Sequence, residues 1–314
     1  MLRYILRRLV SSILVLFVVI TASFFVMRAA PGGPFDGEKK LADEVMANIN
    51  ARYHLDEPIW KQYALQMERI LLHADFGPSM KYPDKSVNEI LADGLPVSLI
   101  LGIQAMFFAL LLGLPAGLYA GLKQNRWQDY VAMTGAMAGV SVPSFVLGPI
   151  LVYLFAMQLQ WFDAANWNGM EHGLLGHLQS SVLPSLTLGM YYAAYVARLS
   201  RGGMLEVVRQ DYVRTARAKG LSERTIVTRH TLKGAIMPVV SYLGPAFAGM
   251  LTGSVVIERI FNIPGLGTHF VQSAFNRDYP LVLGTIVLYS ALLVALNLVV
   301  DIFYTVLDPR VSYD

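Results

Sequence analysis

The chain has no cysteine and little charge. Without a thiol it forms neither a disulfide nor a thiolate metal site. Charged residues make up only 15% of its 314 residues, whereas a soluble domain carries roughly a quarter. Hydrophobic residues make up 55% of the chain, and its mean hydropathy is +0.47. This composition predicts a membrane protein.

Motifs of catalytic chemistry are missing as well. The sequence has no P-loop pattern G-x-x-x-x-G-K-[ST], no zinc-protease pattern H-E-x-x-H and no nucleophile pattern G-x-S-x-G. Its six histidines have no spacing suited to a metal, so we expect them to be ordinary polar residues. These absences disfavour an enzyme. They also predict that the chain binds no metal or cofactor of its own.

Long charge-free runs dominate the sequence. Each reaches the roughly 18 to 20 residues that cross a hydrocarbon core of about 30 Å at about 1.5 Å per residue. We therefore expect an all-α polytopic membrane protein with six transmembrane helices. The six runs are Leu9 to Met27, Leu95 to Leu122, Val131 to Phe162, Gly173 to Ala197, Ala235 to Ile257 and Tyr279 to Val300.

Lysine and arginine are distributed unevenly among the connecting segments. Cations precede the first run and gather between Arg198 and Lys233, while the short loops on the other side carry few. This bias predicts that both termini are cytoplasmic. The chain then divides into the N-terminus with the first span (1–28), an enlarged external helical segment (29–94) and a five-helix core (95–314) that contains a cytoplasmic loop (198–235).

The N-terminal run differs from a cleaved signal peptide. Its 19 residues from Leu9 to Met27 exceed the usual apolar region of about 7 to 15 residues. Arg28 would also occupy the small-residue position of a cut after Ala30. We therefore expect a retained membrane anchor.

The external segment contains helix signals of its own. Asp56-Glu57-Pro58 marks a helix start, and apolar residues recur at helical spacing after it, before it from Leu41, and again from Val87. Two interpretations stay open: amphipathic helices on the outer membrane surface, or a docking surface for an external partner.

Small residues recur every four positions within the runs, a spacing that lets helix backbones approach closely. Rigid packing and helices that move along a pathway are both compatible with this pattern. The residues are Gly113, Gly117 and Gly121, then Gly135 and Gly139, then Gly249 and Gly253.

Ionisable residues are almost absent from the runs. A charge at the bilayer centre costs about 2.5 to 3.5 kcal/mol, and Asp301 is the best candidate for one. Since Arg310 follows soon after, we expect Asp301 to form an interfacial pair or a cap. A stand-alone secondary carrier would need charges deeper in the membrane, so a pump driven by a separate subunit fits better.

The loop from Arg198 to Lys233 holds nine lysines and arginines against three acidic residues. Apolar residues fall at helical spacing before Gly220, which is placed as the glycine just past a helix C-terminus. Ser222 can cap a following helix, with Glu223 in its first turn. We expect a compact helical projection, called the knob below, that is joined to the membrane spans at both of its ends. Attraction to anionic lipid, topogenic charge and docking of a cytoplasmic partner are all compatible with it, and nucleic-acid binding is improbable.

The stretch YVRTARAKGLSERTIVTRHTLKGAIMPVV resembles the cytoplasmic loop of ABC-importer permeases. Arg214 and Thr215 replace the usual Glu-Ala, and the distance from Gly220 to Pro238 is longer than usual, as in the peptide and nickel branch. Further segments match that branch, and the enlarged external segment resembles its B-type oligopeptide permeases. These segments are MLRYILRRL, APGGPFDGE, YHLDEPIWKQY, DFGPS, SVPSF, GSVVIERIFNIPGLG, NRDYPLV and VVDIFYTVLDPRV.

The resemblance implies a permease subunit in the cytoplasmic (inner) membrane of a bacterium. Its partners would be a homologous second permease, two cytoplasmic ATPases that bind ATP and Mg, an external solute-binding protein and membrane lipid. The solute would be an oligopeptide, with a dipeptide, glutathione or a nickel chelate as alternatives.

The resemblance also implies the residues of two sites. The ATPase-coupling residues would be Arg214, Ala216, Arg217, Ala218, Gly220, Leu221, Ser222 and Glu223. The external gate or pathway would include Glu258, Asn262, Pro264, Gly265 and Gly267, although this stretch could also be a simple tight turn.

Overall fold

The computed structural model describes residues 2–30, 43–164, 167 and 173–307. Within these ranges the regular structure is helical, apart from one isolated bridge between Pro78 and Ser86. The predicted fold class, an all-helical polytopic membrane protein, is therefore confirmed.

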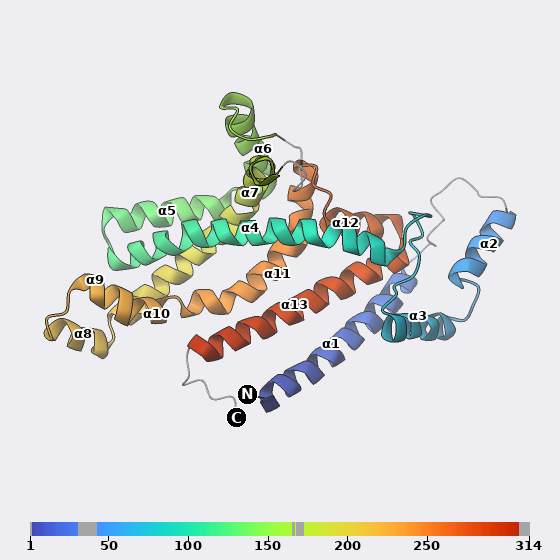
Figure 1. Ribbon diagram of the computed structural model, residues 1–314, viewed down its shortest axis with the longest axis horizontal. Helices are drawn as coiled ribbons and strands as arrows, with labels where there is room; N and C mark the ends of the chain where they lie inside the picture. Colours follow the sequence, from blue (N-terminus) through green and yellow to red (C-terminus); the bar gives the residue numbers. More distant parts are fainter. Residues whose placement is uncertain (1, 31–42, 165–166, 168–172, 308–314) are drawn as a thin grey trace.

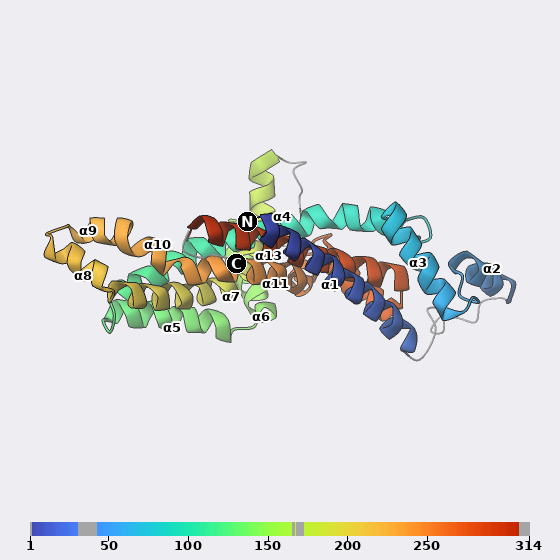
Figure 2. The ribbon, with the colours of Figure 1, turned by 90° about the horizontal axis from the view of Figure 1, so that it is seen from below.

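The molecule is elongated, with α8 and α9 at one end and α2 at the other (Figure 2). Its long helices are α1 (Leu2–Ala29), α4 (Val87–Leu122), α7 (Gly173–Val208), α11 (Met237–Ile260) and α13 (Tyr279–Leu307). The shorter elements are α2 (Asp43–Tyr53), α3 (Ile59–His73), α5 (Trp127–Ser141), α6 (Ser144–Leu151), the π-helix η1 (Val152–Gln158), α8 (Asp211–Ala218), α9 (Glu223–Thr225), the π-helix η3 (Ile226–Thr231), α10 (Leu232–Ala235) and α12 (Leu266–Asn276).

Three helices in the described part of the chain are long and apolar enough to cross a membrane, namely the segments Arg7–Ala29, Val87–Leu122 and Tyr279–Val299. Two bent helix pairs bring the total to as many as five. The run from Gly173 to Ala197 lies within α7, which is too polar to be counted. The number of six spans thus stays a prediction. The side chain of Asp301 lies outside the described residues.

The third predicted run is not one continuous helix. α5 ends at Ser141, and the helix that follows from Ser144 to Gln158 is bent away from it by 104°. Val142 has φ −86° and ψ 115°, because the residue before a proline is disfavoured in the α region. Pro143 then starts the next helix. The charge-free run from Val131 to Phe162 is therefore divided into two helices at Pro143.

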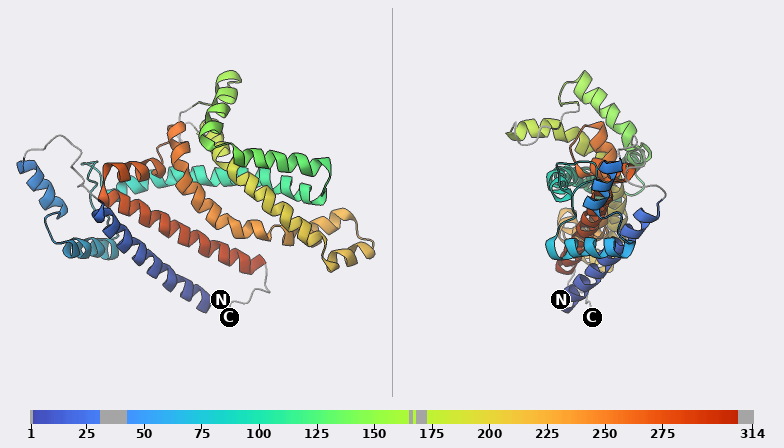
Figure 3. Two further views of the ribbon diagram at one scale, coloured as in Figure 1. Left: turned by 180° about the vertical axis from the view of Figure 1, so that it is seen from behind. Right: turned by 90° about the vertical axis from the view of Figure 1, so that its right-hand side faces the viewer.

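The centre of the fold is the contact between α7 and the C-terminal half of α4, where the two helices run side by side (Figures 1 and 3). A methyl group on Gly113 would lie 2.3 Å from the carbonyl oxygen of Ala193, and one on Gly117 would lie 2.1 Å from that of Ala197. These distances confirm the predicted close approach. Around Gly135 of α5, in contrast, nothing lies within 4 Å of such a methyl group.

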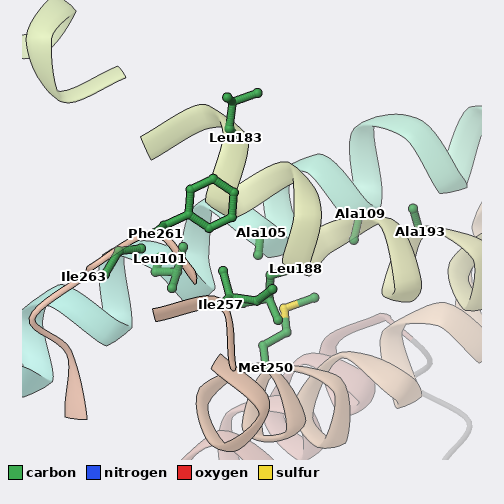
Figure 4. Packing of buried hydrophobic residues seen from close by; sticks show 10 residues of the cluster. All are labelled: Leu101, Ala105, Ala109, Leu183, Leu188, Ala193, Met250, Ile257, Phe261 and Ile263. Carbon is green, nitrogen blue, oxygen red and sulfur yellow. The ribbon is translucent and has the colours of Figure 1, made fainter. Parts of the chain in front are cut away.

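A cluster of buried apolar side chains extends from this contact to α11 (Figure 4). Leu101 and Ala105 of α4 meet Leu188 of α7, with Met250 and Ile257 of α11 against them. Dispersion contacts among these side chains hold the three helices together, since lipid supplies little hydrophobic driving force between helices.

The external segment packs onto the bundle at one end. α3 lies against α1, where the Tyr63 hydroxyl and the Thr21 hydroxyl are 2.7 Å apart and Arg28 Nε donates to Gln62 Oε1 at 3.0 Å. α4 begins at a capping box in which Ser86 and Glu89 bond each other's backbone amides. The helix predicted from Val87 thus continues directly into the second span.

The glycine contacts of α4 generate a first prediction. In Gly117→Ala, the new methyl group has no space between Ala197 and Ser200, so we expect a loss of about 1 to 3 kcal/mol in the free energy of unfolding. Gly135→Ala is the matched control, and we expect it to gain up to about 1 kcal/mol, because alanine favours a helix. Thermal unfolding midpoints of the two variants in detergent measure the difference. Equal midpoints would contradict the close packing.

Candidate functional site

The loop from Arg198 to Lys233 folds into the predicted knob, which consists of α8, α9, η3 and α10. The helical spacing before Gly220 is shared by two helices, because α7 ends at Val208 and α8 begins at Asp211. Gln210 between them is extended, with ψ 148°. This break turns α8 so that its apolar face packs against the rest of the knob. In Figure 1 the knob projects from one end of the molecule.

The knob has a small apolar core of its own. Val213, Ala216 and Ile226 are buried together, and Val207 at the end of α7 packs against them. The two ends of the knob also touch closely where they join the rest of the molecule. A methyl group on Gly203 of α7 would lie 2.3 Å from the carbonyl oxygen of Ala235 in α10. A displacement of the knob would therefore act on α7 and α10 together.

Gly220 and Ser222 shape the tip of the knob as the sequence indicates. Gly220 has φ 77°, a left-handed conformation that glycine adopts without steric cost. The Ser222 hydroxyl caps α9 by accepting from the Thr225 amide at 3.3 Å. Arg217 Nε donates to Glu223 Oε1 at 2.8 Å, and this bond lowers the pKa of the Glu223 carboxyl. The pair is exposed, so it contributes only about 0 to 1 kcal/mol.

Seven of the eight predicted coupling residues lie on the exposed surface of the knob. Ala216 is the exception, because it is buried in the knob's core. Its contribution is therefore to the shape of the knob rather than to its surface. The exposed residues are Arg214, Arg217, Ala218, Gly220, Leu221, Ser222 and Glu223.

A buried ion pair anchors α7 just above the knob. Arg201 binds Asp129 of α5 through two bonds, Nε to Oδ1 at 2.6 Å and Nη2 to Oδ2 at 2.7 Å. Asp129 also accepts from the Asn125 amide at 3.0 Å. A bidentate bond of this kind holds both direction and distance. The α4–α5 turn and the base of the knob are therefore fixed relative to each other.

The predicted gate lies at the opposite end, where a buried carboxylate organises the loop between α11 and α12. Glu258, which is 1% exposed, accepts from the Ser98 hydroxyl at 2.8 Å, the Ser254 hydroxyl at 2.7 Å and the Thr268 amide at 3.1 Å. A methyl group on Gly265 would lie 2.5 Å from that carboxyl group. Glycine is therefore required for the loop to close over Glu258.

The same loop borders a cavity of about 510 Å³. Asn262 and Pro264 are exposed beside the cavity. Glu258, Gly265 and Gly267 are buried and support the loop that borders it. The five predicted gate residues thus lie in and beside the connection between α11 and α12, where two are exposed and three are buried. The cavity is lined by Trp167, Glu258, Arg259, Asn262, Ile263, Pro264, Gly265, Thr268, His269 and Gln272.

His269 lines this cavity. Burial lowers the pKa of its imidazole, and the nearby positive charge of Lys85 lowers it further, while Asp93 opposes them. Its Nδ1 is buried without a hydrogen-bond partner within the described ranges. Among the residues that the structure describes, no three His, Asp or Glu side chains gather in an arrangement that could hold a metal.

Several residues that hold these sites in place could not be found from the sequence pattern. Ser98 lies 160 positions from Glu258, and Asp129 lies 72 positions from Arg201. Asp278 binds Ser79, accepts from the Met80 amide at 3.1 Å and caps α13 through the Leu281 amide at 3.2 Å. The available signal was an acidic residue in a charge-poor stretch.

Two family models together match nearly the whole chain. Residues 113–313 match the binding-protein-dependent transport system inner membrane component, and residues 1–102 match the N-terminal part of such membrane components. Curated relatives match over their full length. The chain is 51% identical to the oligopeptide transport system permease protein OppB of Escherichia coli over 313 residues, which covers 100% of both chains. It is 43% identical to the dipeptide transport system permease protein DppB of Bacillus subtilis, covering 99% of this chain and 98% of that one.

Solved structures share the fold at low identity. An inward-facing structure of the MetNI methionine ABC transporter matches with a TM-score of 0.58 and 17% identity, covering 70% of this chain and 96% of that one. An amino acid ABC transporter with histidines matches with a TM-score of 0.51 and 19% identity, covering 69% and 94%.

The core of the knob generates a prediction with an internal control. Ala216→Asp places a carboxylate among Val213 and Ile226, which costs roughly 2 kcal/mol or more because the new group has no partner there. We expect trypsin to cleave the knob faster in this variant of the isolated subunit. Ala218→Asp changes an exposed alanine of the same helix and should cleave at the wild-type rate. Similar rates for the two variants would argue against a folded knob.

The Glu258 cluster generates a further prediction. Ser98→Ala removes a donor to the buried carboxylate and the acceptor of the Leu266 amide, which bonds Ser98 Oγ at 2.8 Å. We expect the free energy of unfolding to fall by about 1 to 3 kcal/mol, measured as a lower thermal midpoint. The control is Ser141→Ala, which loses only a local bond at an exposed site. A midpoint equal to that control would show that the cluster contributes no stability.

Proposed function

The chain belongs to the family of binding-protein-dependent transport system inner membrane components, and from this premise we propose that it carries oligopeptides into a bacterial cell. As a member of this family it is a permease component rather than a catalytic subunit. The observation that carries the oligopeptide assignment is 51% identity to OppB of Escherichia coli over the whole length of both chains.

The proposed transporter consists of this permease, a homologous second permease, two cytoplasmic ATPases and an external solute-binding protein. ATP and Mg bind to the ATPases, and this chain binds no cofactor. The knob supports this assignment, because it presents seven exposed residues on a folded core. Contact with the ATPases would be made by Arg214, Arg217, Leu221 and their exposed neighbours.

Coupling follows from the attachment of the knob. Closure of the ATPases on ATP would displace α8, and the tight contact of Gly203 with Ala235 would pass that displacement to α7 and α10. α11 follows α10 after a bend of 44° and carries Glu258 in its last turn, beneath the proposed outer gate. Tilting of these helices would open the path between the two permeases to alternate sides.

The proposed topology has six spans in the inner membrane, with both termini and the knob in the cytoplasm. The cation bias supports it. In Figure 1, α1 begins and α13 ends on the side of the molecule nearer to α8, while α2 and α3 lie on the other side. The cavity beside Asn262 and Pro264 would then face the external binding protein.

A dipeptide is the second candidate solute, because DppB of Bacillus subtilis is 43% identical to the chain. Both relatives are named as peptide permeases. Peptides share a backbone and charged termini, so a wide path can serve chains of different length.

Uptake by the complete transporter tests this proposal. In vesicles that contain all subunits and the binding protein, we expect saturable uptake of a labelled pentapeptide that requires ATP and stops when the ATPases are left out. A labelled dipeptide run in parallel distinguishes the two solutes. Exclusive dipeptide uptake would correct the solute, and uptake driven by a proton gradient without ATPases would overturn the assignment.

A further inference from the structure

Polar aromatic side chains gather where α7 and α11 lie side by side (Figure 3). The Tyr191 hydroxyl donates to the Tyr195 hydroxyl at 3.3 Å, and the Tyr195 ring stacks on that of Tyr242 with centroids 5.9 Å apart. The guanidinium carbon of Arg198 lies 5.1 Å from the Tyr195 ring centroid. Tyr191, Tyr195, Arg198 and Tyr242 are called the tyrosine stripe below.

The packing of α7 on α4 places Tyr191 at the middle of the membrane and Arg198 near the end of the span. Gly189 packs on Ala105, Gly113 on Ala193 and Gly117 on Ala197, so α7 around Tyr191 is level with residues 105–113 of α4, and Arg198 is level with the stretch that follows Gly117. Residues 105–113 lie at the centre of the charge-free run 95–122. Membrane tyrosines are usually enriched at the two membrane–water interfaces. The stripe therefore needs another explanation.

The hydroxyl groups of the stripe exclude contact with lipid. Tyr191 is 42% exposed, and its bond to Tyr195 uses only one of the two hydroxyl donors. A hydroxyl without a partner costs roughly 4 to 8 kcal/mol in a medium that offers no hydrogen bond. Arg198 is exposed on the same side of α7, nearer to the end of the span. This face must therefore meet water or a polar partner.

The exposed face of α4 at the same depth shows what a lipid-facing surface looks like in this chain. Ile103, Phe107 and Leu111 follow one another at helical spacing and are 58%, 58% and 52% exposed, with no polar atom in their side chains. α7 differs from α4 in composition as well, since its span is too polar to be counted among the membrane-crossing helices of the described residues.

We propose that the tyrosine stripe lines the aqueous route along which the solute crosses the membrane, and that it recognises peptides. Tyrosine rings contact side chains of any kind, their hydroxyls bond the amide groups of a peptide backbone, and the Arg198 guanidinium binds a carboxylate. None of these contacts selects a particular sequence. The inference rests on the proposed function and identifies the surface that the peptide meets.

Thiol labelling tests this inference, because the chain has no cysteine of its own. Tyr191→Cys and Tyr195→Cys are compared with Phe107→Cys and Leu111→Cys at the same depth, in the complete transporter and with a charged thiol reagent. The reagent needs a thiolate, which forms in water and not in hydrocarbon. We expect the α7 positions to react at least about tenfold faster than the α4 positions. A saturating concentration of unlabelled pentapeptide should slow thiol labelling at the α7 positions alone.

The outcomes separate this inference from the function on which it rests. Labelling of α7 no faster than α4 would overturn the inference, and so would fast labelling only in the isolated subunit, because the second permease would then cover the stripe. Retained ATPase activity in each variant confirms that the transporter is folded. If the unmodified transporter took up no peptide, the proposed function would instead be overturned.

Discussion

The direct contact between the backbones of α4 and α7 is the constraint on which the other features depend. Lipid is as apolar as a leucine side chain, so helices in a membrane are held by close packing rather than by hydrophobic transfer. Gly113 and Gly117 allow α4 to touch carbonyl groups of α7. One helix of this pair carries Ser98 to the outer cluster, and the other carries Arg201 to the base of the knob. The contact between α4 and α7 therefore fixes the positions of the two candidate sites relative to each other.

The two ends of the molecule are built on the same principle. At each end a buried acidic side chain, Asp129 or Glu258, is satisfied by directed hydrogen bonds from another helix. Burying the charged groups costs free energy, and removing one partner of such a bond is strongly destabilising. They hold the ends of helices in defined positions. The residues left exposed beside them, at the tip of the knob and at Asn262, are those available to partners or solute.

Local features of the knob could be predicted because they depend on a few neighbouring residues. The left-handed Gly220 and the Ser222 cap follow from short-range backbone chemistry, whereas the gate residues were implied only by the resemblance. The burial of Ala216 could not be predicted, because it depends on Ile226 and Val207 folding back onto α8. The size of the 104° bend after α5 depends on packing in the same way. A proline in an apolar run marks a weak point, but the helix on either side can continue or turn, and packing decides which.

The sequence by itself determined that this protein is helical and largely apolar, because length and apolarity decide which segments can leave water, and glycine and serine decide where helices stop. The resemblance of its motifs to known permeases then indicated its class. Only the tertiary structure decided which polar groups are paired and which faces stay open. Ser98 reaches Glu258 across 160 positions, and Tyr195 meets Tyr242 on a different helix. Such pairs are set by the relative placement of whole helices, which depends on the packing of many side chains at once and leaves no signal in any short stretch of sequence.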